Sequence, residues 1–108
     1  MNNPTTPGAF PGQPVLRNRR KKRDGWIRFE EHFSKSHPMF LQHIGVAFPA
    51  LTRTELQICA MIRNLLSSKQ IAEQLSIDER TVDNHRSSIR RKILLTHDES
   101  LHAVLSRF

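Results

Sequence analysis

The stretch that most constrains this chain runs from Ser67 to Leu95, where two helices are predicted on either side of a short turn. Ser67 and Gln70 have the spacing of a capping box, which predicts that the first helix begins there. Apolar residues then recur at spacings of three and four, so they share one helical face: Ile71, Ala72 and Leu75. This periodicity stops at Ser76, and Asp78 is a suitable N-cap for a second helix.

The second helix is predicted to have two different faces. One carries an apolar stripe of Val82, Ile89 and Ile93, and the other is polar, with Arg80, Asp83, Asn84, Ser87, Ser88 and Arg91. Two short helices at a steep angle, with the small Ala72 at their contact, are typical of a helix-turn-helix. The second helix of that motif fits the major groove of DNA. The pattern alone leaves open an ordinary helical hairpin with a solvated polar face.

The residues from 51 to 93 resemble the DNA-binding domain of LuxR/FixJ-type (GerE-like) regulators. The positions that match the family pattern are Leu51, Thr52, Glu55, Leu66, Ser67, Lys69, Ile71, Ala72, Leu75, Ile77, Thr81, Val82, His85, Ile89 and Lys92. The resemblance implies a four-helix, all-α domain, a recognition helix in the major groove, and binding of double-stranded DNA as a homodimer. It also implies a location in the bacterial cytoplasm, on the nucleoid.

The resemblance assigns roles to particular residues of the recognition helix. It implies base reading by Asp83, Asn84 and Ser87. An asparagine pairs with adenine and a carboxylate accepts from cytosine N4. A carboxylate close to DNA phosphates is unfavourable unless it is paired, and Arg80 and Arg86 are the candidate partners of Asp83. The candidate phosphate contacts are Lys69, Arg80, Thr81, Arg86, Arg90, Arg91 and Lys92.

Composition sets the outer limits of the prediction. With 108 residues, the chain has room for one small core, and its net charge of +7 indicates an anionic partner. No apolar run approaches the length of a membrane span, and a single cysteine fits a reducing compartment. We expect Cys59 to be a small buried hydrophobe rather than a redox sensor.

The N-terminal segment, residues 1–23, is predicted to be a disordered arm. Its first part is rich in proline and glycine, which disfavours a packed core. Its last seven residues include six basic ones, which suit contacts with phosphates or a minor groove. These are Arg17, Arg19, Arg20, Lys21, Lys22 and Arg23. The alternative is a solubilising linker.

Residues 24–48 are predicted to add one or two helices to the domain at 49–108. Asp24 is the expected N-cap of the first, and Trp26, Phe29 and Phe33 follow at helical spacing. Core packing is the better interpretation of these aromatic residues, although such side chains can stack on bases. In the family a glycine precedes the Leu-Ser pair. Leu65 stands there in this chain, and we expect it to pack on the added helices.

The C-terminal helix is predicted to begin at a third capping box, Thr96 with Glu99. The resemblance implies that this helix forms the dimer interface, through Leu101, Val104, Leu105 and Phe108. The same apolar stripe could instead pack on its own domain.

No residue pattern indicates an enzyme, a metal site or a cofactor. The spacing of His32, His37 and His43 does not suit a zinc site, and no nucleophile elbow or phosphate loop occurs. The predicted function is a sequence-specific transcriptional regulator. Two alternatives stay open: a helix-turn-helix that binds another regulator or RNA polymerase, and non-specific coating of nucleic acid by the basic arm.

Overall fold

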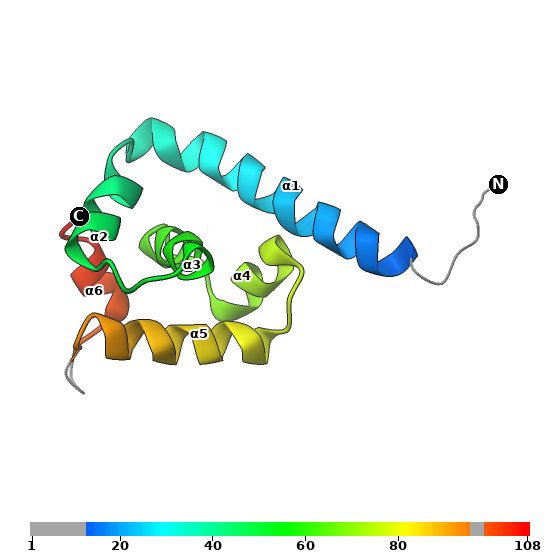
Figure 1. Cartoon of the computed structure of the whole chain (residues 1–108). Helices are drawn as coiled ribbons and strands as arrows, with labels where there is room; N and C mark the ends of the chain where they lie inside the picture. The colour runs from blue at the N-terminus through cyan, green and yellow to red at the C-terminus, as the bar shows by residue number, and fades with distance from the viewer. Residues whose placement is uncertain (1–12, 96–98) are drawn as a thin grey trace.

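Six α-helices form the part of the chain that the computed structural model describes, residues 13–95 and 99–108, with side chains from Asp24 onward (Figure 1). The helices are α1 (Gln13–Ser36), α2 (Phe40–Ala47), α3 (Arg53–Arg63), α4 (Ser68–Leu75), α5 (Glu79–Lys92) and α6 (Leu101–Leu105). Within these residues there is no strand, so the all-α prediction is confirmed. Helix α3 lies at the centre, between α1 on one side and α5 on the other (Figure 1).

One hydrophobic core joins the N-terminal extension to the rest of the domain. Ile58, Met61 and Ile62 of α3 lie at its centre, together with Cys59. Burial raises the pKa of the Cys59 thiol to about 12, with a further contribution from the negative charge of Glu55. The thiol is therefore protonated and shielded, as expected for a small buried hydrophobe.

The aromatic residues of the extension belong to this core, as predicted. The rings of Phe29 and Phe33 stack with their centroids 5.3 Å apart. Phe33 also meets Phe40 of α2 edge to face at 5.4 Å. Trp26, Phe33 and Phe40 are buried, so the extension enlarges the core of the domain.

Helix α1 begins earlier than the sequence predicts. We expected its N-cap at Asp24, but the helix begins at Gln13, so the basic run of residues 17–23 lies on a helix rather than in a disordered segment. Arginine and lysine are good helix formers, and Pro14 in the first turn is compatible with a helix start. The disorder predicted for residues 1–12 concerns residues outside the described part.

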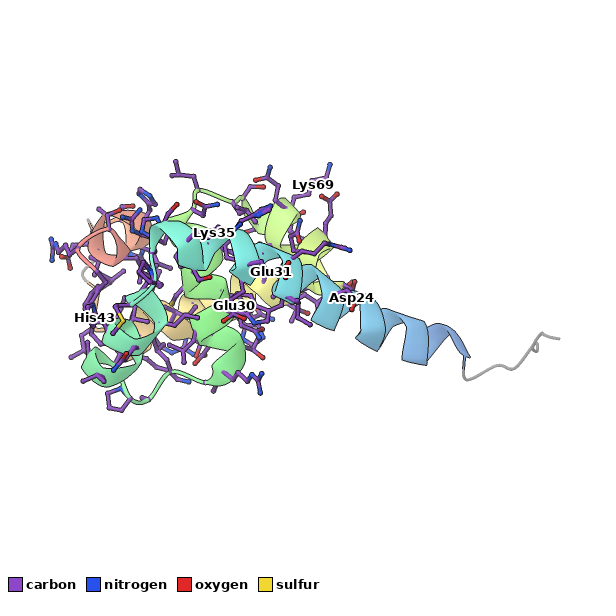
Figure 2. The ribbon with its side chains drawn as sticks, turned by 90° about the horizontal axis from the view of Figure 1, so that it is seen from above. Asp24, Glu30, Glu31, Lys35, His43 and Lys69 are labelled. Carbon is purple, nitrogen blue, oxygen red and sulfur yellow. The ribbon has the colours of Figure 1, made fainter. Side chains whose placement is uncertain are left out.

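A glycine that sequence analysis did not single out allows α1 to approach α4. A Cβ atom on Gly25 would lie 3.0 Å from the carbonyl carbon of Gln74 and closer still to its oxygen. These Gln74 atoms belong to the backbone, so they cannot rotate away from a Cβ atom as a flexible side chain would. In Figure 2, Asp24, its neighbour, marks the point where α1 leaves the rest of the domain.

The turn between α3 and α4 contains a strained leucine. Leu65 has φ = 67°, the left-handed region where glycine is favoured, and its side chain is 74% exposed. The prediction that Leu65 packs on the added helices is therefore wrong: the turn keeps the backbone conformation that a glycine would adopt without strain. Leu94, after α5, has φ = 60° and is likewise exposed.

This strain predicts that Leu65→Gly raises the free energy of unfolding by about 1 kcal/mol, since the substitution relieves the left-handed penalty and removes no packing. The matched control is Leu66→Gly, which removes a half-buried side chain from the edge of the core and should be destabilising. Urea unfolding of both variants measures the difference. A loss of stability in Leu65→Gly would mean that the leucine makes a packing contact after all.

Candidate nucleic-acid interface

The pairing of α4 and α5 is set by caps and by a tight turn. Ser67 Oγ accepts from the backbone N–H of Gln70 at 3.2 Å, and the Gln70 side chain accepts from the Ser67 N–H at 2.8 Å. The predicted capping box is therefore confirmed. Helix α4 ends at Leu75, its C-cap Ser76 has a left-handed φ of 55°, and Ile77 N–H donates to the carbonyl of Ala72. Asp78 is the N-cap of α5, as predicted, but its side chain makes no capping hydrogen bond.

Helix α5 has one buried and one exposed face. Val82 and Ile89 are fully buried, and Ile93 is nearly so. The side chains exposed on the other face are Arg80, Asp83, Asn84, Ser87 and Arg91. The three candidate base-reading residues thus share one exposed surface, which we call the reading face (Asp83, Asn84, Ser87).

Asp83 is held by α4 rather than by an arginine. Ser68 Oγ, at the first position of α4, donates a 2.8 Å hydrogen bond to Asp83 Oδ1. Among the described side chains Asp83 takes part in no ion pair, so the predicted partnership with Arg80 or Arg86 is absent. Ser68 was not among the predicted site residues, because it lies fifteen positions from Asp83 and the two meet only in the folded chain.

The candidate phosphate-binding residues differ in how far their side chains are exposed to solvent. Arg80 and Arg91 are exposed on α5, as is Lys69 on α4, and in Figure 2 Lys69 lies at the outer edge of the domain. The side chains of Thr81 and Arg86 are half-buried. Arg90 donates from Nη1 to the backbone carbonyl of Glu99 at 3.1 Å, which ties α5 to the segment before α6.

Lys92 forms an ion pair within the domain, and its role as a phosphate contact stays a prediction. Its Nζ lies 2.7 Å from Oε1 of Glu55, which is 3% exposed. Ser88 also turns inward and donates from Oγ to Glu55 Oε2 at 2.7 Å, so it does not belong to the exposed polar face. The Lys92 side chain is 29% exposed, so contact with a DNA phosphate would require it to leave this ion pair.

Glu55 anchors the reading helix to the centre of the domain. Its Oε1 also accepts from the backbone N–H of Thr52 at 2.8 Å, and its own N–H donates to Thr52 Oγ1, which confirms the predicted capping box of α3. Burial raises the pKa of Glu55, but the hydrogen bonds from Lys92, Thr52 and Ser88 and the Lys92 charge outweigh it, and the pKa falls to about 2. The sequence pattern indicated the cap but not the contact with α5.

The C-terminal helix packs on its own domain, which was the alternative to the dimer interface. It is short, with Ser100 as its N-cap, whereas the expected cap Thr96 lies outside the described residues. Leu101, Val104 and Leu105 are buried within the chain, and the Phe108 ring meets that of Phe48 at 5.7 Å. The contact between subunits that the resemblance implies for this helix stays a prediction.

Within residues 13–95 and 99–108 no group of histidine, cysteine and acidic side chains has an arrangement that would hold a metal ion. Over the same part of the chain, no helix combines the length and the apolar character needed to cross a bilayer.

The turn between α4 and α5, the cap at each helix start and the exposed polar face of α5 define a helix-turn-helix protein of the DNA-binding class. The family described as bacterial regulatory proteins, luxR family (GerE), matches residues 49–105, more than half of the chain. The chain belongs to this family, and the match supports DNA-binding transcriptional regulation as its general role. Comparisons with curated proteins and with solved structures gave no match.

Proposed function

We propose that the chain regulates transcription by reading a specific DNA sequence in the major groove with α5. The observation that carries this proposal is the reading face, where Asp83, Asn84 and Ser87 lie together and exposed. The opposite face of α5 is anchored in the core by Val82 and Ile89. A helix held rigidly on one side presents its other side to base edges without a further ordering cost.

Each residue of the reading face suits a different base contact. The Asn84 amide both donates and accepts, which suits N6 and N7 of adenine. The Asp83 carboxylate accepts only, which suits N4 of cytosine. Lys69 on α4 and Arg80 and Arg91 on α5 are exposed and are the best placed to contact phosphates.

The basic helical segment of α1 supplies a second contact in this proposal. Residues 17–23 lie on the part of α1 that projects beyond the domain, past Asp24 (Figure 2). Six positive charges on a projecting helix suit flanking phosphates, and their contribution should fall steeply with salt. Two copies on a dyad site remain part of the proposal, with the C-terminal helix α6 and the partly buried Phe108 as the proposed contact between them. We expect a protein with this role to be located in the cytoplasm, on the chromosome.

One observation favours the protein-binding alternative. Leu65 and Leu94 are large apolar side chains held at strained backbone positions, and both are more than 70% exposed. Exposed apolar side chains are common contacts between proteins. Binding to RNA polymerase or to another regulator would use them without involving the reading face.

The proposal predicts that Asn84→Ala costs about 1–3 kcal/mol of DNA-binding free energy at one base position and relaxes the base preference there. The control is Arg91→Ala, which should weaken binding to all sequences alike and reduce its salt dependence. Competition with duplexes that differ at single positions measures both effects. An unchanged preference in Asn84→Ala would remove that residue from the base-reading set.

A further inference from the structure

The contact between Ser68 and Asp83 bears on base choice, because it joins the first residue of α4 to the reading face. Ser68 Oγ donates to only one oxygen of Asp83, Oδ1, at 2.8 Å. The hydroxyl is uncharged, so it orients the carboxylate without forming an ion pair with it. The second oxygen, Oδ2, is left to accept from a ligand.

A carboxylate fixed in this way is a selective acceptor. Guanine presents two acceptors in the major groove, thymine one acceptor and a methyl group, and adenine an acceptor beside its donor. Cytosine presents only the N4 amino donor, so it is the base edge that an acceptor-only group meets without repulsion. A carboxylate free to rotate would be less selective, because it could turn toward a neighbouring arginine such as Arg80 or Arg86.

We propose that Ser68 is a positioning residue that fixes the Asp83 carboxylate and thereby makes cytosine the preferred base at one position of each DNA half-site. This inference rests on the proposed function. Ser68 contacts no base in this account and acts through Asp83. The same hydrogen bond joins the first turn of α4 to the reading face on α5.

The test is a parallel selection of duplexes from a random library with the wild-type chain and three variants. Ser68→Ala should reduce the cytosine preference about fivefold at one position and leave the adenine preference set by Asn84 unchanged. Ser68→Thr, which keeps the hydroxyl, should restore the cytosine preference. Asp83→Asn should replace cytosine by adenine at that same position, since an amide pairs with adenine.

Thermal unfolding of the same variants separates positioning from stability. Ser68 is not the N-cap and its hydrogen bond is exposed, so Ser68→Ala should change the stability little. Identical motifs in the wild type, Ser68→Ala and Asp83→Asn would overturn the inference while leaving the proposed function intact. Loss of all preferences together in Ser68→Ala would also overturn it. A wild-type chain that selects no motif would overturn the proposed function and this inference with it.

Discussion

Replacing Gly25 by alanine should lower the free energy of unfolding by about 1–3 kcal/mol, because the new methyl group meets the Gln74 backbone and α1 must move away from α4. Alanine is a better helix former than glycine. Where the new methyl group meets no other atom, the substitution should therefore raise the free energy of unfolding by about 0.5–1 kcal/mol. Gly45 in α2 provides that control, since a Cβ there meets nothing within 4 Å. Gly25→Ala and Gly45→Ala should therefore have opposite signs.

Urea unfolding of the two glycine variants measures this difference directly. A similar increase in the free energy of unfolding of both variants would contradict the close approach of α1 to α4. The consequence for function concerns the basic segment: α1 carries residues 17–23, so a shift of α1 also shifts six positive charges relative to α5. The salt dependence of DNA binding should then change in Gly25→Ala and not in Gly45→Ala.

Removing the Glu55 carboxylate has the largest expected effect on stability. Glu55→Ala leaves the Lys92 ammonium half-buried without its partner, and Ser88 and the Thr52 N–H lose their acceptor. Breaking a buried pair in this way costs about 3–5 kcal/mol. The control is Glu31→Ala on the exposed side of α1, which should change the stability by no more than about 0.5 kcal/mol.

The depressed pKa of Glu55 fixes the sign of its pH dependence. Its pKa is about 2 in the folded chain and 4.5 in a free side chain, so the folded state holds the proton less tightly than the unfolded state. The stabilisation is therefore complete above the unfolded pKa and is lost as the pH falls toward the folded pKa. It amounts to about 3 kcal/mol. Glu55→Gln should remove that part of the acid sensitivity. Equal acid sensitivity in Glu55→Gln and the wild type would contradict this assignment.

Local signals in the sequence predicted the elements that depend on nearby residues. Ser67 with Gln70 and Thr52 with Glu55 form the capping boxes that their spacing predicts. The polar face of α5 is exposed because helical periodicity separates it from Val82 and Ile89. The helical extension also follows its aromatic periodicity, with Phe33 in the core.

Contacts between distant residues were not predictable from such signals. Lys92 matched the pattern of a phosphate contact, yet its partner Glu55 is thirty-seven positions away. The apolar stripe of α6 fitted either a dimer or its own core, and its packing against α3 involves residues far away in the sequence. A glycine inside a helical pattern often has a packing reason, and that was the available signal for Gly25. Its contact with Gln74, however, depends on how α1 crosses α4.

Base reading by α5 can be tested by selecting duplexes from a random library with the wild-type chain. At about physiological salt, non-specific phosphate contacts are weakened and specific ones dominate the selection. We expect a motif with fixed bases opposite Asp83 and Asn84, and two half-sites related by a dyad if two copies bind. Retained DNA without any motif would contradict base reading by α5 and would assign the affinity to the basic segment of α1. No retained duplex would contradict DNA reading altogether and favour a protein partner.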